Sequence, residues 1–231
     1  MRLDRFVEKQ LACSARTVRH MFARRTILLN GVPAANGFQQ ITRFCRVEAQ
    51  GKLLRDCAPI YLMMHKPRGC VSATRDDHLP TVLSLIDLPC REQLHLAGRL
   101  DFNTTGLLLL TNDGRWSSAI TLPEKKNPKT YLVETREEIT PEYVSKFAEG
   151  VYFGFENLTT LPAQLKILAP TTAELTLVEG RYHQVKRMFG FFRNKVTSLH
   201  RVSVGNIVLD ENLESGAWRP LLDTEIAAFR A

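Results

Sequence analysis

Two spacings of apolar residues divide this chain of 231 residues into predicted helices and strands. Near the start, helical spacing occurs twice, first at Leu3, Phe6, Val7 and Leu11 and then at Val18, Met21 and Phe22. Ser14 precedes the second group and is a suitable N-cap. A short apolar run from Ile27 then enters an Asn30-Gly31 turn, which predicts a strand followed by a tight turn.

From residue 60 onwards, apolar and alternating runs are interspersed with single stretches of helical spacing. Strands are predicted at 60–64, 107–111, 130–135, 163–168, 173–178 and 201–209. Helices are predicted near 81–87, 115–120, 141–149 and 183–192. Because strands and helices do not alternate steadily, the order favours an α+β fold with a largely antiparallel sheet.

The excess positive charge belongs to the first quarter of the chain. Residues 1–58 hold 11 Lys and Arg against 4 Asp and Glu, whereas residues 59–231 hold 20 of each. Such a basic segment is a candidate for binding a phosphate backbone, although a merely cationic surface has the same composition. Arg16 and Arg19 lie away from the apolar face of their predicted helix and would meet solvent or RNA. The stretch from Gly51 to Pro59 is predicted to be a linker.

Composition and motifs argue against several other classes. The five cysteines form no Cys-x-x-Cys pair and the histidines have no i, i+4 spacing, so neither a zinc site nor a disulfide framework is expected. There is no Walker motif or glycine-rich phosphate loop. The first residues are too charged for a signal peptide, and the longest apolar run, Ile60 to Met64, is too short to cross a bilayer. We therefore expect a cytoplasmic protein without a membrane segment.

One carboxylate stands in a loop directly before an apolar strand. The segment reads Gly98-Arg99-Leu100-Asp101, followed by Thr104-Thr105-Gly106-Leu107. Such a strand can hold a loop carboxylate rigidly at the mouth of a cleft. Taken alone, however, an Asp in this setting is more often a turn former that bonds to its own backbone.

Three further segments hold candidate residues. Lys66-Pro67-Arg68-Gly69 is predicted to be a turn. Tyr131 begins a strand, where a core role is the default, but its ring would also support an unstacked base. Lys186 lies at the margin of an apolar helical face, while Arg187 points nearly opposite.

The stretch from Gly180 to Leu209 contains no acidic residue. Its basic residues therefore suit an RNA-facing wall; they are Arg181, Lys186, Arg187, Arg193, Lys195 and Arg201.

Together these motifs resemble those of the RNA pseudouridine synthases, and residues 1–58 resemble an S4 RNA-binding domain. The resemblance implies an S4-like domain over 1–58 and a catalytic domain over 59–231 whose central sheet is mixed and mostly antiparallel. The first domain departs from the usual S4 pattern at Ala15, Arg25 and Thr26, which leaves the details of RNA contact open.

The resemblance also implies roles for individual residues. Asp101 would be the catalytic carboxylate, Tyr131 would stack on the uracil, and Lys186 would keep Asp101 ionised, because a desolvated carboxylate otherwise tends to take up a proton. Arg99 would fill the gap left by the flipped nucleotide. The residues expected to bind RNA elsewhere are Arg16, Arg19, Arg181 and Arg187. Neither a cofactor nor a metal is expected, because the isomerisation gains and loses no atoms.

Within the family, the chain looks most like the branch that acts on the small ribosomal subunit. The implied reaction converts one uridine of 16S ribosomal RNA, position 516, to pseudouridine. The expected partner is this RNA within a small-subunit particle, and the expected state is a monomer. Two alternatives stay open: a large-subunit 23S target, and a non-catalytic RNA-binding assembly factor on the same fold.

Overall fold

The computed structural model describes residues 1–229, which fold as two compact units. The first unit comprises Met1–Pro59, and the second begins at Ile60. Among residues 1–229, no helix has both the length and the apolar character needed to cross a membrane.

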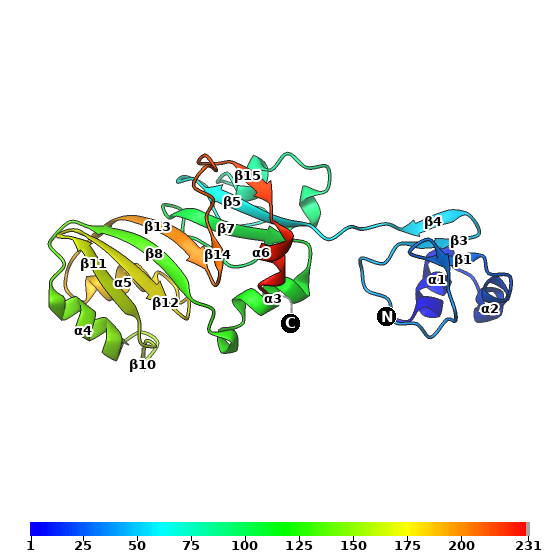
Figure 1. The fold of residues 1–231 in the computed structure, drawn as a ribbon, viewed down its shortest axis with the longest axis horizontal. Coiled ribbons are helices and arrows are strands. Elements are labelled where there is room, and N and C mark those ends of the chain that lie inside the picture. The colour runs from blue at the N-terminus through cyan, green and yellow to red at the C-terminus, as the bar shows by residue number, and fades with distance from the viewer. Residues whose placement is uncertain (230–231) are drawn as a thin grey trace. The chain divides into compact units, whose positions relative to one another are not determined.

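The first unit packs two helices on a small antiparallel sheet (Figure 1). Its elements are α1 (Leu3–Leu11), α2 (Ala15–Ala23), β1 (Ile27–Leu29), β2 (Val32–Pro33), β3 (Val47–Ala49) and β4 (Lys52–Arg55), with strand order β2-β1-β3-β4. Ser14 caps α2, as predicted, by accepting a hydrogen bond from the Thr17 amide at 3.2 Å. The predicted turn after β1 is also present, with positive φ angles of 52° at Asn30 and 83° at Gly31.

The predicted linker is wrong over residues 52–55, which form strand β4. Gln50 and Gly51 both adopt positive φ, 53° and 77°, so the chain turns back and pairs with β3. The Arg55 side chain then secures the strand end, because its Nε donates to the Cys45 carbonyl at 3.0 Å and its guanidinium stacks on Phe6. Composition missed this hairpin because charged residues suit an exposed strand as well as a linker.

A mixed, mostly antiparallel sheet forms the centre of the second unit, which confirms the predicted α+β class. Its main path runs in the order β11-β12-β8-β13-β7-β5-β15. These strands are β5 (Tyr61–Lys66), β7 (Thr105–Thr111), β8 (Lys129–Thr135), β11 (Gln164–Ala169), β12 (Thr172–Leu177), β13 (Val196–Val204) and β15 (Trp218–Pro220). Within this path the β13–β7 pair is parallel.

Three helices of the second unit lie close to their predicted positions, whereas several short helices and strands were not predicted. The helices are α3 (Gly114–Thr121), α4 (Pro141–Glu149) and α5 (Gln184–Gly190). The predicted helix at 81–87 is instead a short 3-10 helix, η1 (Val82–Leu85). Strand β15 was not predicted from the sequence, nor were the following short elements: η2 (Arg91–Gln93), β6 (His95–Leu96), η3 (Pro123–Lys125), β9 (Tyr152–Phe153), β10 (Leu158–Thr159) and α6 (Asp223–Ala227).

The predicted strand at 201–209 begins earlier and is divided. Strand β13 starts at Val196, and a turn containing Gly205 separates it from β14 (Ile207–Val208). Gly205 has a φ of 55°, and an added Cβ would lie 2.4 Å from the Phe229 ring. The turn therefore favours glycine on both conformational and steric grounds.

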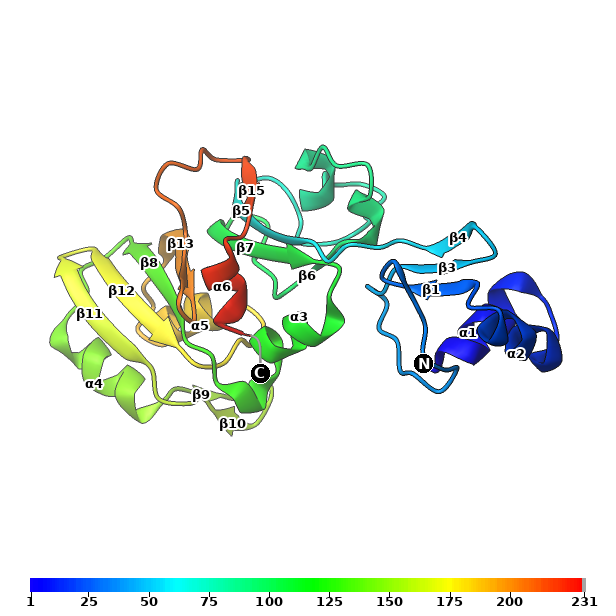
Figure 2. The ribbon, with the colours of Figure 1, turned by 45° about the vertical axis from the view of Figure 1, so that its right-hand side comes forward.

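The two ends of the large sheet are covered differently (Figures 1 and 2). At one end, α4 and α5 pack their apolar residues against one face of β8, β11, β12 and β13. At the other end, β5 and β7 are buried on both faces, by α3 and α6 on one side and by the η1 segment on the other. Strand β7 is consequently buried on both faces, and the loop that precedes it lies at the junction of the two ends.

Candidate active site

The loop that carries Asp101 is fixed by hydrogen bonds from several directions. Ser72 bonds twice to Leu100, donating to its carbonyl at 2.7 Å and accepting from its amide at 3.0 Å. The Thr104 amide donates to the Asp101 carbonyl, and the Gly69 amide donates to the Phe102 carbonyl. The backbone of Asp101 is therefore positioned before any ligand binds.

Lys66 supports this loop from the protein interior. Its side chain is fully buried, and its Nζ donates to the carbonyls of Pro67, Phe102 and Thr104 at 2.9, 3.3 and 3.0 Å. Burial lowers the pKa of the Lys66 ammonium, an effect that the nearby Cys70 and then Asp101 partly oppose. The Lys-Pro-Arg-Gly motif is thus both the expected turn and a clamp on the Asp101 loop.

Arg201 is a second clamp; it lines the hollow beside this loop but is buried there rather than exposed on an RNA-facing wall. The residue is buried, and its guanidinium donates to the carbonyls of Leu107 and Arg99 at 2.8 and 3.3 Å. Its backbone approaches Gly106 so closely that a Cβ there would lie 2.3 Å from the Arg201 carbonyl oxygen. Gly106 also has a φ of 104°, so this glycine is required for the start of β7 to pair with β13.

Asp101 forms an ion pair with Lys186, a residue 85 positions away in the sequence. The Lys186 Nζ donates to Asp101 Oδ2 at 2.8 Å, and both side chains are about one-third exposed. The His183 Nε2 lies 3.6 Å from the same oxygen. His183 directly precedes α5, has a φ of 50° and stacks on Tyr182, so this turn directs both basic groups toward the carboxylate.

A cleft of about 610 Å³ contains this ion pair. Tyr131 lines it from β8 with only 8% of the residue exposed, and Arg99 lines it from the Asp101 loop. Arg99 is exposed, and within the described part of the chain no hydrogen bond holds its guanidinium. The structure therefore brings Asp101, Tyr131, Lys186 and Arg99 to one cavity.

Lys129 is a cleft residue that sequence reasoning missed. Burial, followed by the positive charge of Arg201, lowers the pKa of its ammonium, and its Nζ donates to the Asn127 carbonyl at 3.0 Å. The available signal was the period of two along a strand, which places residues 129 and 131 on the same face.

Arg181 and Arg187 are both held by acidic residues from outside the acid-free stretch 180–209. Arg181 donates from Nε to Glu179 at 2.9 Å. Arg187 makes a two-pronged contact with Glu156 and stacks on Phe153. Hydrogen bonding to Arg187 lowers the pKa of the Glu156 carboxyl. Arg181 lines the cleft and uses only its Nε for Glu179, whereas both terminal nitrogens of Arg187 are occupied by Glu156.

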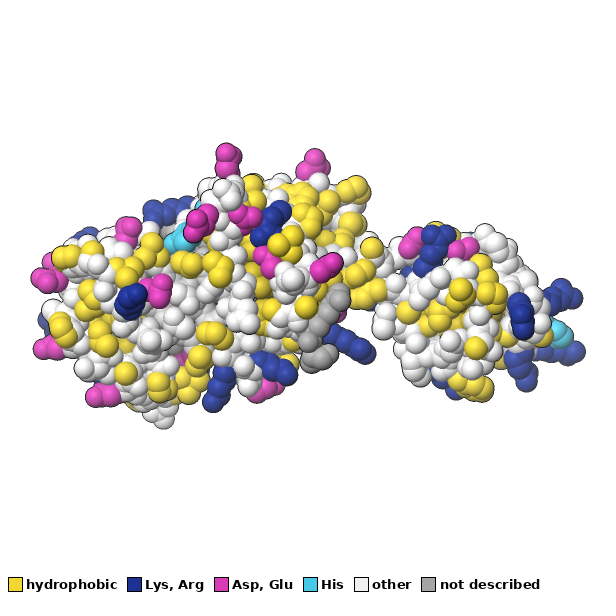
Figure 3. All heavy atoms as spheres, in the orientation of Figure 1, with side chains coloured by type: hydrophobic (Ala, Val, Ile, Leu, Met, Phe, Trp, Pro, Cys, Tyr) yellow, Lys and Arg dark blue, Asp and Glu magenta, His cyan; other side chains and the backbone are white. Residues whose placement is uncertain are grey.

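Arg16 and Arg19 are exposed on α2 of the first unit, opposite the buried Val18 and Met21. Figure 3 shows dark-blue and cyan side chains gathered over the α2 end of this unit. The arrangement matches the expected basic helix face, and a role in RNA binding stays a prediction for both arginines.

Comparisons with known proteins identify the family of this chain. Residues 60–190 match the family described as RNA pseudouridylate synthase. A crystal structure titled as a pseudouridylate synthase superposes with a TM-score of 0.73, at 40% identity, over 100% of both chains.

Two curated relatives extend this similarity to nearly the whole chain. A Pseudomonas aeruginosa protein is 51% identical over 99% of this chain and 100% of its own length. An Escherichia coli protein is 41% identical over 99% of both chains. Each is named ribosomal small subunit pseudouridine synthase A. These matches confirm the family expected from the motifs: the chain belongs to the RNA pseudouridylate synthases, isomerases that convert uridine in RNA to pseudouridine.

Proposed function

We propose that this chain isomerises one uridine of 16S ribosomal RNA, at position 516, to pseudouridine. The observation that carries the proposal is the Asp101–Lys186 ion pair, 2.8 Å long, in a cleft that Tyr131 also lines. The small-subunit target is supported by the names of full-length relatives at 41–51% identity.

The reaction breaks the bond between N1 of uracil and C1′ of ribose, and forms a bond from C5 of the base to the same carbon. The C5 proton leaves and N1 ends protonated, so atoms balance and no oxidant or reductant is required. Asp101 acts as a nucleophile at the sugar or the base, or as a base at the ribose 2′ carbon. Its fixed loop serves each route, because all of them need one carboxylate oxygen at a defined position.

The residues around Asp101 have three further roles in the reaction. Lys186 orients the carboxylate and supplies its counter-charge while the bound base excludes water. Tyr131 supports the uracil ring and can assist removal of the C5 proton. A uridine inside folded RNA must be everted to reach the cleft, and Arg99 has the exposed, planar cation that can fill its vacated place.

The first unit supplies affinity for RNA as an S4-like domain. Its net charge of +7 accounts for the whole excess of the chain, and Arg16 and Arg19 are exposed on one helix. Contacts of this kind with phosphates fix register and strengthen binding without reading bases.

Mapping pseudouridine in ribosomal RNA from cells tests this function. Cells that lack the protein should have uridine at position 516 of 16S RNA, and the wild-type gene should restore pseudouridine there. The Asp101→Asn variant should be produced at normal levels and restore none. Loss of a 23S pseudouridine instead would refute the small-subunit target, and an unchanged map of both RNAs would refute enzymatic action on ribosomal RNA.

A further inference from the structure

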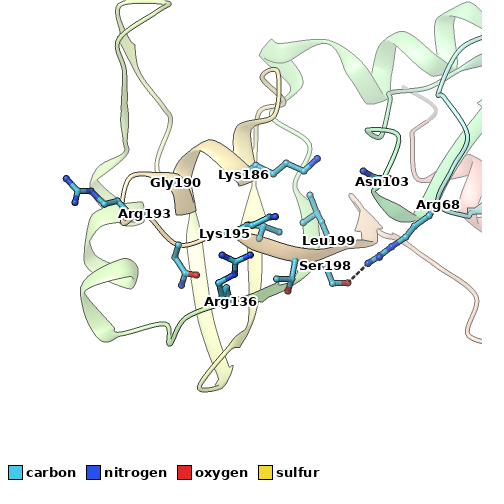
Figure 4. A pocket seen from close by; sticks show the side chains of 12 residues that line it. Arg68, Asn103, Arg136, Lys186, Gly190, Arg193, Lys195, Ser198 and Leu199 are labelled. Carbon is cyan, nitrogen blue, oxygen red and sulfur yellow. Dashed lines mark hydrogen bonds between the residues drawn. The ribbon is translucent and has the colours of Figure 1, made fainter.

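A second hollow, which we call the basic groove, lies beside the cleft on the second unit. It encloses about 770 Å³. Its charged lining residues are Arg68, Arg136, Lys186, Arg193 and Lys195. Figure 4 shows Arg68 and Arg193 at opposite ends of the groove, with Arg136 and Lys195 between them. No Asp or Glu of residues 1–229 contributes to the lining.

Four of these cations have no acidic partner. Lys186 is paired with Asp101, but within residues 1–229 no ion pair joins Arg68, Arg136, Arg193 or Lys195 to a carboxylate. The contact recorded for the Arg68 side chain is a hydrogen bond to the Ser198 hydroxyl at 3.4 Å. All four are exposed. Like charges gathered without a counter-charge repel one another, so this arrangement favours binding of a polyanion.

The basic groove adjoins the active-site cleft. Lys186 and Leu199 line both hollows. Asn103, which lines the groove, follows Asp101 by two positions in the same loop. A strand whose nucleotide occupies the cleft can therefore continue past Lys186, where the groove offers a path lined with cations.

We propose that the basic groove binds the backbone phosphates of the nucleotides next to the target uridine. This inference rests on the proposed function, because it assigns the path of the RNA on one side of the modified base. Exposed Lys and Arg side chains suit phosphates as point charges, and they act without reading sequence. The groove therefore supplies affinity and register at the active site itself, in addition to any contribution from the first unit.

Salt-dependent RNA binding tests this path. We combine Arg136→Gln, Arg193→Asn and Lys195→Gln in the full chain, with Asn at position 193 because that residue has a φ of 57° and Asn tolerates this conformation. The probe is a 16S RNA fragment that contains the target uridine. The dissociation constant should rise about tenfold, and the slope of log affinity against log salt should become shallower by roughly 0.7 for each lost phosphate contact.

Two matched controls separate charge from structure. Lys166→Gln removes one exposed lysine from β11, on the sheet face opposite to the buried Leu165, and should leave the slope unchanged, whereas Lys195→Gln alone should reduce it. A charge-preserving variant with Arg136→Lys, Arg193→Lys and Lys195→Arg should keep the wild-type slope. If these side chains acted through packing or hydrogen bonds rather than charge, exchanging Arg and Lys would not preserve the slope.

The outcomes distinguish this proposal from the proposed function. Wild-type affinity and slope in the neutralised triple variant would overturn the groove as an RNA path, even if the enzyme modifies 16S RNA. Normal binding of the fragment with weakened binding of the small-subunit particle would overturn it in favour of a protein contact. A wild-type enzyme that bound the fragment but formed no pseudouridine would refute the proposed target. The salt slopes of the wild type and the triple variant would still show whether the groove binds RNA.

Discussion

The active-site cleft and the basic groove share Lys186 but differ in how their charges are arranged. In the cleft, Asp101 is paired with Lys186 and Glu179 with Arg181. In the groove, Arg136, Arg193 and Lys195 have no acidic partner within the described residues. A site that performs chemistry needs its carboxylate held in one position, whereas a site that binds a polyanion leaves its cations available for the ligand.

The cleft also differs from the groove in its support. Buried side chains from two strands, Lys66 of β5 and Arg201 of β13, hold the Asp101 loop through backbone carbonyls. The groove cations are exposed side chains. Substitutions in the two regions should therefore have different consequences, and the predictions below test that difference from the largest effect to the smallest.

The largest effect is expected for Asp101→Asn. Product formation should fall more than about a thousandfold, because the variant lacks the reactive carboxylate. Affinity for RNA should be retained or slightly increased, since Lys186 becomes an unpaired cation like those of the groove. Single-turnover pseudouridine assays and salt-dependent binding measure the two effects. Substantial turnover by this variant would remove Asp101 from the mechanism.

Lys186→Gln should lower kcat about a hundredfold while KM changes much less. The substitution leaves the Asp101 carboxylate without its 2.8 Å ion pair, so the group loses both orientation and charge compensation. Lys186→Arg should recover part of the rate, because it restores a cation. If KM rose and kcat stayed constant, Lys186 would act in binding phosphates, like the groove cations, rather than in catalysis.

Lys66→Met should destabilise the second unit and slow catalysis together. The change leaves the buried carbonyl of Thr104 without its donor, at a cost of about 1–3 kcal/mol in the free energy of unfolding, while the Phe102 carbonyl keeps its bond from the Gly69 amide. Urea unfolding measures the stability, and a fall in kcat indicates that the Asp101 loop is held less firmly. Lys195→Gln is the contrasting groove variant and should unfold like the wild type. Equal stability of Lys66→Met and the wild type would show that the clamp is dispensable.

The smallest effect is a pH dependence of stability that arises at His200. Burial, together with the facing His65, lowers the pKa of this histidine from 6.5, and its ring bonds to the Thr105 hydroxyl at the start of β7. At acid pH the unfolded state therefore binds more protons than the folded state. The contribution of His200 to the free energy of unfolding is complete above about pH 6.5 and is lost as the pH falls below that value.

The slope from this one group should not exceed about 1.4 kcal/mol per pH unit. Urea unfolding between pH 5 and 8, roughly the range in which histidine titrates, measures it, and His200→Gln should flatten the curve. A wild type whose stability did not decline toward acid pH would contradict this role of His200.

Local patterns in the sequence were sufficient for much of the fold. Helical and alternating spacing located α3, α4, α5 and most strands of the large sheet, because periodicity reports which side chains face a core. The Asn30-Gly31 turn and the Ser14 cap follow equally from local chemistry. The hairpin at 50–55 was missed, because its strand carries charged residues that are also common in linkers.

Motif resemblance located the candidate site, but only the tertiary structure showed which of its charged residues are buried, paired or exposed. Sequence placed Arg181, Arg187 and Arg201 in one basic wall with Arg193 and Lys195. The fold buries Arg201, pairs Arg187 with Glu156 from 31 residues away, and leaves Arg193 and Lys195 exposed without acidic partners.

Thus the sequence alone determined the fold class, the family and the identity of the candidate reactive side chains. The tertiary structure decided which cations are neutralised within the protein and which can meet a ligand. The physical reason is that the energy of a charge depends on its distance to other charges and on burial. Both quantities are set by segments that are remote in sequence and come together only when the sheet forms.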